Sequence, residues 1–219
     1  MIRVTASFSN RREAGGLLGG KLAAAGRWTH PLVLGLPRGG VPVAFEVALE
    51  LDAPLDVFTV RKLGVPGNEE LAFGAIATGG IRVFNREIIE QFHISTHVAD
   101  EVGDKAEREL RWCEQAYRHT SAPPPVQGRQ VILVDDGIAT GATMQAAVNA
   151  VRIAGAAWVV VAVPVAARES VAKLRKQVDR MITLAVPAPF CSVGRFFQDF
   201  SPTTDGEVQE LLRIAAARP

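Results

Sequence analysis

The segment from Val131 to Thr143, VILVDDGIATGAT, constrains the fold of this chain more than any other. It opens with a run of apolar, mostly β-branched residues, which is typical of a strand buried on both faces of a parallel sheet. Asp135 and Asp136 follow this strand, and a loop of small residues then leads into a helix. Because ligands of open α/β sheets bind outside the carboxyl ends of the strands, the segment predicts an α/β fold with a ligand site at the acidic pair.

The loop after the acidic pair has the chemistry of a phosphate-binding turn. Small side chains allow backbone N–H groups to approach a phosphate, and a helix N-terminus adds unpaired N–H groups and partial positive charge. The predicted phosphate-binding residues are Ala139, Thr140, Gly141, Ala142 and Thr143. Carboxylates repel phosphate but suit sugar hydroxyl groups or a cation, so a ribose 5-phosphate would use both halves of the motif. The alternative is an ordinary strand-to-helix turn whose acidic pair is solvated.

A second strand, loop and helix precede this segment. Residues Pro31 to Leu36 predict a buried strand, Pro37-Arg38-Gly39-Gly40 a short glycine loop, and Val41 to Leu51 a helix. A plain turn into a helix could have the same residues, so this loop alone is weak evidence for a ligand site. The evidence is stronger because the chain also contains the acidic segment.

Two further cations follow another predicted strand. Leu55 to Val60 predicts a strand that ends at Arg61 and Lys62. Because the carboxyl ends of parallel strands meet at one edge of a sheet, we expect Arg38, Arg61 and Lys62 to lie near the acidic pair. The alternative is that Arg61 and Lys62 are solvated surface cations.

These motifs resemble a known family. VILVDDGIATGAT is similar to the signature of the type I phosphoribosyltransferases, which bind 5-phosphoribosyl 1-pyrophosphate (PRPP), and Pro37-Arg38-Gly39-Gly40 resembles their pyrophosphate loop. The resemblance implies that Asp135 and Asp136 hold the ribose hydroxyl groups and that the small-residue loop holds the 5-phosphate. The pyrophosphate-binding residues that it implies are Arg38, Gly39, Gly40, Arg61 and Lys62.

The catalytic residues implied by the resemblance are Asp135, Asp136, Arg61 and Lys62. They would position PRPP and stabilise charge as the bond between ribose and pyrophosphate breaks. The implied cofactor is Mg²⁺, held mainly through PRPP and near the two aspartates rather than by a dedicated set of protein ligands.

The resemblance also implies an α/β architecture, a mainly parallel sheet flanked by helices, as one domain over residues 1–219. A β-hairpin flap would span about residues 64–85, since Thr78-Gly79-Gly80 has the residues of a hairpin turn between two strand-like runs. Such a flap would cover PRPP and exclude water. Glu69 and Glu70 are either functional flap residues or solvated, and the sequence does not separate these alternatives.

A small C-terminal hood is expected over about residues 186–219. This part of the chain breaks the strand–helix alternation, and its first half is rich in phenylalanine. Phe190, Phe196 and Phe197 are candidates for stacking on an acceptor, because flat rings stack well on bases. The alternative is that these rings pack the last helix against the sheet.

Three other segments predict helices with specific features. Gly15-Gly16 and Gly19-Gly20 have no strand before them, so they favour a helix packed closely on a neighbour over a phosphate loop. Residues 86–119 predict an amphipathic helix that is broken near Ser95-Thr96. Thr204 opens a capping box for the last helix.

The composition and charge of the chain limit the classes of protein to which it can belong. The chain has 219 residues, 24 basic and 23 acidic, for a formal net charge of +1, which gives no electrostatic footprint for nucleic acid. No apolar run is long enough to span a membrane, and two cysteines suggest no disulfide framework, so we expect a cytoplasmic protein. The expected partners are PRPP and a small-molecule acceptor. Related enzymes are commonly dimers, and the sequence leaves open whether this chain forms a homodimer.

The sequence supports an active Mg²⁺-dependent phosphoribosyltransferase first and a PRPP-sensing regulatory protein second. A hydrolase that uses water as the acceptor is a weaker third alternative. Hypoxanthine-guanine phosphoribosyltransferases have an aspartate in the loop where this chain has Ala139. This difference argues against a 6-oxopurine acceptor of that type. It leaves open adenine-, uracil- or xanthine-like enzymes and acceptors that are not bases.

Overall fold

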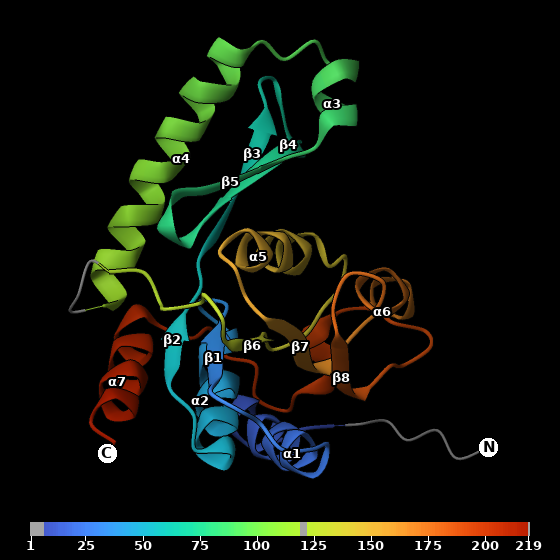
Figure 1. Ribbon diagram of the computed structural model, residues 1–219. Helices are drawn as coiled ribbons and strands as arrows, with labels where there is room; N and C mark the ends of the chain where they lie inside the picture. Colours follow the sequence, from blue (N-terminus) through green and yellow to red (C-terminus); the bar gives the residue numbers. More distant parts are fainter. Residues whose placement is uncertain (1–6, 119–121, 219) are drawn as a thin grey trace.

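The computed structural model describes residues 7–118 and 122–218. A parallel sheet forms its centre (Figure 1). The strands are β1 (Pro31–Gly35), β2 (Leu55–Val57), β6 (Gln130–Val134), β7 (Trp158–Val165) and β8 (Arg180–Ala185). Their spatial order is β2-β1-β6-β7-β8, and every neighbouring pair is parallel. The strand order therefore reverses between β1 and β6, and in doubly wound sheets this switch point is where ligands bind.

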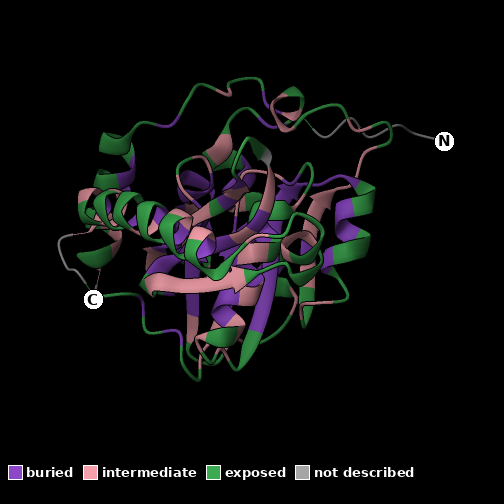
Figure 2. Ribbon diagram, turned by 90° about the horizontal axis from the view of Figure 1, so that it is seen from above, coloured by how far each residue is buried: buried purple, intermediate pink, exposed green. Residues whose placement is uncertain are grey.

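Helices cover both faces of the parallel sheet. They are α1 (Arg11–Ala24), α2 (Gly40–Leu51), α5 (Ala142–Ile153) and α6 (Arg168–Leu174). The first two pack on one face, where Val33 and Ile132 point, and the other two pack on the opposite face, where Leu34 and Leu133 point. Both faces of the strands are therefore buried, as the unbroken apolar runs predict (Figure 2).

The last helix, α7 (Asp205–Ala216), covers the β2 edge of the sheet. Thr204 caps it by accepting a hydrogen bond from the Glu207 N–H at 3.2 Å, as the capping box predicts. Val208 and Leu211 pack against Phe45 of α2 and Val57 of β2.

A second, antiparallel sheet lies over α5 (Figure 1). Its strands are β3 (Val60–Val65), β4 (Asn68–Ala77) and β5 (Ile81–Phe84). The predicted hairpin is confirmed: Ala77 pairs with Ile81, and Gly79 and Gly80 occupy the turn with φ of 80° and 74°. Most side chains cannot adopt such φ values without strain.

The predicted strand from Leu55 to Val60 is confirmed at its start, as β2, but its predicted end is wrong. The chain leaves the parallel sheet after Val57, and β3 of the antiparallel sheet begins at Val60. Arg61 and Lys62 therefore lie inside β3 and not at the end of a parallel strand. The sequence predicts a single strand here because no glycine, proline or other turn residue separates β2 from β3.

Two helices complete the upper lobe, α3 (Arg86–Gln91) and α4 (Thr96–Tyr117). Ser95 caps α4 by accepting from the Val98 N–H at 3.3 Å, which confirms the predicted break. Packing between α4 and the antiparallel sheet gives this lobe its own core, with Phe73 and Leu110 among the buried residues. The lobe is thus larger than the hairpin flap expected over residues 64–85.

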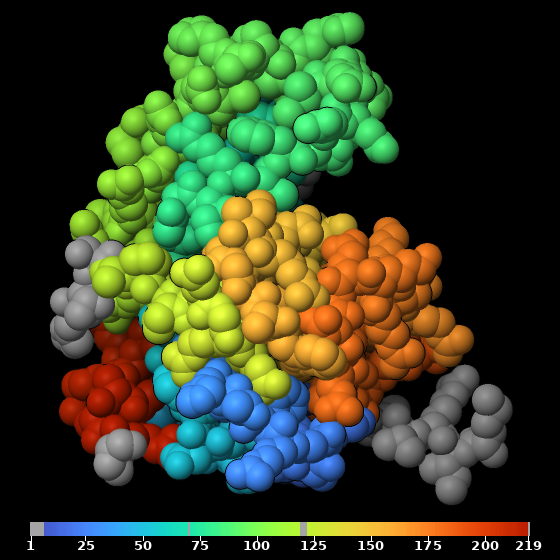
Figure 3. Space-filling view, viewed as in Figure 1, coloured from blue at the N-terminus to red at the C-terminus, as the bar shows by residue number. Residues whose placement is uncertain are grey.

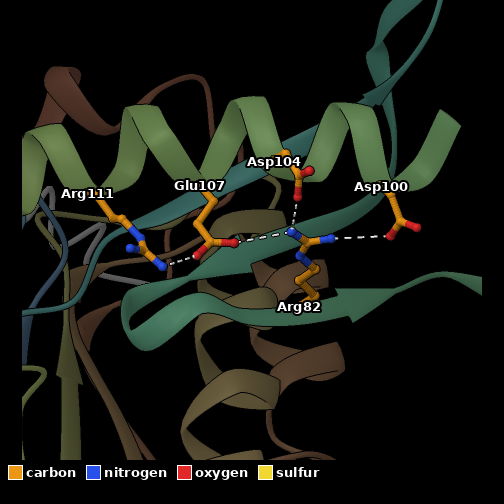
Figure 4. Close-up of polar contacts among 5 residues, drawn as sticks. All are labelled: Arg82, Asp100, Asp104, Glu107 and Arg111. Atoms are coloured by element: carbon orange, nitrogen blue, oxygen red, sulfur yellow. Dashed lines mark hydrogen bonds and ion pairs between the residues drawn. The ribbon is translucent and has the colours of Figure 1, made fainter. Parts of the chain in front are cut away.

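Arg82 of β5 joins the antiparallel sheet to α4 (Figure 4). Its guanidinium lies 2.6 Å from Asp104, 3.2 Å from Glu107 and 3.4 Å from Asp100. Arg111 contacts the other oxygen of Glu107 at 2.5 Å, and hydrogen bonds from Arg111 and Arg82 lower the pKa of the Glu107 carboxyl. These groups are partly solvated, so they orient α4 on the sheet more than they stabilise the fold.

Small residues let α1 pack directly on α2. A Cβ at Gly15 would lie 2.7 Å from the Val43 carbonyl oxygen, and one at Gly19 would lie 2.8 Å from Glu50 Cβ. A Cβ at Gly16 or Gly20 would contact nothing within 4 Å. The glycine pairs therefore act as the sequence predicts, with one member of each pair facing the neighbouring helix.

Gly15→Ala is expected to lower the free energy of unfolding by roughly 1–3 kcal/mol, because its methyl group would overpack the contact with α2. Gly16→Ala, one residue away on the open face, is expected to raise it by about 0.5–1 kcal/mol, because alanine favours the helix. Urea denaturation of both variants checks this, and destabilisation of equal size by both would contradict the packing.

Candidate functional site

The loops after β1 and β6 meet at the switch point of the sheet. A Cβ at Gly39 would lie 2.2 Å from Asp136 Oδ2, and one at Gly40 would lie 2.7 Å from the Val134 carbonyl oxygen. Only glycine fits at these positions without displacing its neighbours. The peptide bond between Pro37 and Arg38 is cis. The structure thus brings together the two segments that the sequence singled out, residues 37–40 and 131–143.

The acidic pair is largely enclosed by protein. Asp135 lies against Gly40, and its Oδ1 accepts a hydrogen bond from the Asp136 N–H at 2.9 Å. Burial raises the pKa of Asp135 well above its ordinary value, and the charge of Asp136 raises it further. Burial also raises the pKa of Asp136, while Arg11 opposes this change.

Sequence reasoning missed Arg11. Its Nε lies 2.8 Å from Asp136 Oδ2, although the two residues are 125 positions apart. Nothing in the local sequence indicates the contact, since Arg11 is one of two adjacent arginines at the start of α1.

The predicted phosphate loop leaves its backbone donors free. Among the described residues, no hydrogen-bond acceptor serves the N–H groups from Thr140 to Thr143. Gly141 is the N-cap of α5, with φ of 80°. Because it is a glycine, it has no side chain that could accept a hydrogen bond from these groups. Ser170 of α6 holds the loop in place, because its hydroxyl donates a hydrogen bond to the Ala139 carbonyl oxygen at 2.5 Å. The loop can therefore receive an anion at a helix N-terminus.

Arg38 and Arg61 line one cavity of about 460 Å³, between the β1 loop, β3, α4 and α7. Arg38 Nη1 lies 3.8 Å from Asp205 Oδ1, and Arg61 Nη1 lies 3.5 Å from Glu109 Oε2. Both guanidinium groups are about half exposed, at 53% and 41%, so neither is fully satisfied by these loose pairs. Thr59 Oγ1 is buried in the same wall without a hydrogen-bond partner among the described residues.

Lys62 faces a different space. Successive strand residues point to opposite faces, and Lys62 lines a cleft of about 540 Å³ with Phe84, Ala142 and Gln145. Figure 3 shows the surface hollowed between the lobe that carries α3 and the part that carries α5 and α6. The expected Arg61–Lys62 pair is thus divided between two spaces. Glu69 is exposed, and the side chain of Glu70 lies outside the described residues.

The phenylalanines of the predicted hood pack with one another around a short 3-10 helix, Val193–Phe196. Phe197 lies between Phe8 and Phe200, with ring centroids 5.4 and 5.1 Å away, and is only 7% exposed. Phe190 and Phe196 stack on each other at 5.9 Å and are half-buried. The cluster packs on Phe8 and the start of α1, so the idea that it holds down the last helix is wrong.

Val193 extends this hood to the acidic loop. A Cβ at Gly137 would lie 2.5 Å from Val193 Cγ1, so the loop and the hood are in close contact. The predicted acceptor-binding segment therefore lies beside the predicted ribose-binding residues. Whether Phe190, Phe196 or Phe197 contacts an acceptor stays a prediction.

The acidic pair fits a cation held mainly by its ligand. Within residues 7–118 and 122–218, no group of three or more His, Cys, Asp or Glu side chains could hold a metal ion. Asp136 Oδ2 already pairs with Arg11, which leaves few protein oxygens for coordination. Mg²⁺ commonly binds through substrate phosphates with few protein ligands, and this donor set is compatible with that mode.

The helices in the described part of the chain include none with the length and apolar character of a membrane span.

Comparison with known proteins identifies the family. A sequence model described as the phosphoribosyl transferase domain matches residues 11–194. The chain belongs to the phosphoribosyl transferase family. The match includes both loops at the switch point and the antiparallel lobe, and it ends within the phenylalanine-rich hood.

Individual family members are also similar. Two Mycobacterium tuberculosis proteins, named as candidate phosphoribosyl transferases, are 46% identical over 206 residues, which is 94% of this chain and 46% of theirs. The chain thus spans about half the length of these relatives. A crystal structure of a Thermus thermophilus protein is 42% identical, with a TM-score of 0.84, covering 94% of this chain and 97% of that one. This likeness supports the fold, a parallel sheet with an added antiparallel lobe.

Asp135→Asn is expected to raise the free energy of unfolding at neutral pH by on the order of 1 kcal/mol. Burial raises the pKa of Asp135 in the folded chain, so its ionised form destabilises the fold above that pKa. The amide oxygen of asparagine can still accept from the Asp136 N–H. The difference should shrink as pH falls from above the folded pKa to the ordinary range, where both states protonate.

Thermal unfolding over a range of pH measures this difference. Asp100→Asn on exposed α4 is the control, with an expected change near zero at every pH. A variant at position 135 that is less stable than the wild type at neutral pH would contradict the assignment.

Proposed function

We propose that this protein is a phosphoribosyltransferase that transfers ribose 5-phosphate from PRPP to a nucleobase-like acceptor and releases pyrophosphate. The observation that carries this proposal is the contact of Gly39 and Gly40 with Asp136 and Asp135 at the switch point. It places a pair of carboxylates, a loop with free N–H groups and a cavity with two arginines along one edge of the sheet. A molecule with a ribose between two phosphate groups matches this order of sites.

Asp135 and Asp136 hold the ribose hydroxyl groups in this proposal. When the bond from ribose C1 to pyrophosphate breaks, the ring becomes electron-deficient, and nearby carboxylates favour that positive charge. The protein would act mainly by positioning the ribose and the acceptor, since its groups need form no covalent bond. The Asp136 side chain is only 15% exposed, so its ionised carboxylate acts on a nearby positive charge more strongly than it would in water.

The 5-phosphate binds the loop from Ala139 to Thr143. Its N–H groups are free, the first turn of α5 adds partial positive charge, and Thr140 and Thr143 are exposed donors. Lys62 lines the cleft that also includes Ala142, so it would approach this end of PRPP from the antiparallel lobe.

Pyrophosphate binds the glycine loop and the cavity beside it. Arg38 and Arg61 supply two guanidinium groups, and the backbone of Gly39 and Gly40 supplies the surface between them and the ribose. Mg²⁺, bound through PRPP oxygens near Asp135 and Asp136, would neutralise charge on the departing group.

The acceptor binds beside the hood in this proposal, where Phe190 and Phe196 have partly exposed rings. The antiparallel lobe serves as the flap that covers PRPP, and residues 1–219 form a single domain around the switch point. Ala139 in place of an aspartate disfavours a 6-oxopurine acceptor. Cys113 and Cys191 are free thiols, which supports a reducing, cytoplasmic location.

A PRPP-sensing protein without turnover is the second candidate. The ion pair between Arg11 and Asp136 is compatible with it, because the cation offsets part of the negative charge that would stabilise a positively charged ribose ring during turnover, whereas binding of the ribose hydroxyl groups does not need that charge. An enzyme and a sensor would bind PRPP in the same place, so only turnover separates them.

Asp135→Asn and Asp136→Asn are each expected to weaken PRPP binding by about tenfold or more, because a charge-assisted hydrogen bond to a ribose hydroxyl is lost. Isothermal titration calorimetry with Mg²⁺ measures this, with Asp100→Asn as the control. Unchanged affinity in both variants would rule out the proposed ribose site.

Arg38→Ala and Arg61→Ala are each expected to weaken pyrophosphate binding by about tenfold, since each removes a cation from the same cavity. Arg213→Ala, on the exposed side of α7, should have no effect. Equal affinity of all three variants for pyrophosphate would contradict the cavity assignment.

Incubation of the protein with PRPP, Mg²⁺ and a panel of purine and pyrimidine bases tests catalysis itself. Release of pyrophosphate that depends on one base would establish the transferase and identify the acceptor. Tight binding of PRPP without release for any base would favour the sensor, and release with water alone would favour a hydrolase.

A further inference from the structure

Arg11 makes three separate contacts through one guanidinium group. Its Nε donates to Asp136 Oδ2 at 2.8 Å, and its Nη1 donates to the Ser201 carbonyl oxygen at 2.8 Å. Its central carbon lies 3.9 Å from the centre of the Phe200 ring, within the range of a cation–π contact. One arginine of α1 thus connects the acidic pair to the chain segment before α7.

The ion pair between Arg11 and Asp136 is closed to most solvent. The side chains are 11% and 15% exposed, so their attraction is stronger than that of a surface pair. The pair also lies against the glycine loop, because a Cβ at Gly39 would be 3.3 Å from Arg11 Nε and 2.2 Å from Asp136 Oδ2. Arg11 therefore sits where the ribose and pyrophosphate sites of the proposed function adjoin.

We propose that Arg11 is a positioning residue that holds Asp136 ionised and correctly oriented for the ribose, and that Phe200 and Ser201 in turn hold Arg11. This inference rests on the proposed function. Arg11 occupies Oδ2, whereas Oδ1 of Asp136 has no hydrogen-bond donor among the described residues and is available to a ribose hydroxyl.

Direct binding of pyrophosphate by Arg11 is a weaker explanation of its position. Its guanidinium is engaged by a carboxylate, a carbonyl oxygen and an aromatic ring, and it is largely buried. Arg38 and Arg61, in contrast, keep about half of their side-chain surface exposed.

The two residues that hold Arg11 from the C-terminal segment lie outside the family match. That match ends at residue 194, before Phe200 and Ser201.

The charges around Asp136 determine how its protonation should respond to a mutation. Asp135 lies next to it on the loop, Arg11 faces it from α1, and Arg38 begins the glycine loop. Asp199, in the segment before α7, is bound by the N–H and hydroxyl of Ser201. Since Arg11 is the cation paired with Asp136, its removal should allow Asp136 to take up a proton at a higher pH.

The test measures PRPP affinity by calorimetry with Mg²⁺ over a range of pH for the wild type, Arg11→Lys and Arg11→Gln. Arg12→Gln is the matched control, because Arg12 is adjacent on α1 but 60% exposed and pairs with Glu46. We expect Arg11→Gln to lose about tenfold or more in affinity. We also expect its acid-side loss of binding to move to higher pH, and Arg11→Lys to restore part of both effects.

A purely structural role for Arg11 would lower the amount of folded protein without moving the pH midpoint, and that result would overturn the proposal. In an Asp136→Asn background, Arg11→Gln should have little further effect on affinity, whereas an undiminished effect would also overturn it. Relative to the wild type, Phe200→Leu should lower the affinity for PRPP and move the acid-side loss of binding to higher pH, as Arg11→Lys should. An unchanged affinity and pH midpoint in Phe200→Leu would overturn the role assigned to the C-terminal segment.

A measurement without PRPP separates this inference from the proposed function. Carboxyl ¹³C NMR titration of Asp136 in the wild type and in Arg11→Gln reports the protonation directly. If the wild type fails to bind PRPP, the proposed function fails, yet a higher pKa of Asp136 in Arg11→Gln would still support control by Arg11. An identical Asp136 titration in these two proteins would overturn the Arg11 proposal, whatever the affinity for PRPP.

Discussion

The close approach of the β1 loop to the carboxyl end of β6 is the constraint on which the rest of the structure depends. β1 and β6 pair from Pro31–Gln130 to Gly35–Val134, so their loops leave the sheet side by side. Gly39 and Gly40 then allow the loop backbone to reach the two aspartates, where any Cβ would collide. Without these glycines, the loop that carries Arg38 could not lie against the two aspartates.

The acidic pair illustrates the conflict between stability and function. Burial raises the pKa of both neighbouring carboxyls, and the charge of Asp136 raises the pKa of Asp135 further. Arg11 offsets part of this destabilisation by pairing with Asp136. Such strain is expected where a site must bind a ligand, because the groups are arranged for the ligand and not for the empty fold.

The antiparallel lobe contributes to the site although it has a core of its own. Arg118, only 6% exposed, joins the end of α4 to β2 through a 2.7 Å contact with Asp56 and a hydrogen bond to the Val57 carbonyl oxygen. This anchor holds α4 beside the β1 loop, so Arg61 of β3 can share a cavity with Arg38. The chain belongs to the phosphoribosyl transferase family and spans about half the length of its Mycobacterium tuberculosis relatives.

Local patterns in the sequence determined the buried strands, the hairpin turn at Gly79-Gly80, the caps at Ser95 and Thr204, and the glycine face of α1. Each depends on burial, φ or hydrogen bonding within a few residues, so neighbouring side chains carry the information. Tertiary structure alone decided the boundary between β2 and β3, the separation of Arg61 from Lys62, the packing of Phe197 on Phe8, and the pairing of Arg11 with Asp136. These features depend on where the chain travels after each strand, and long-range contacts leave no periodic trace in the sequence.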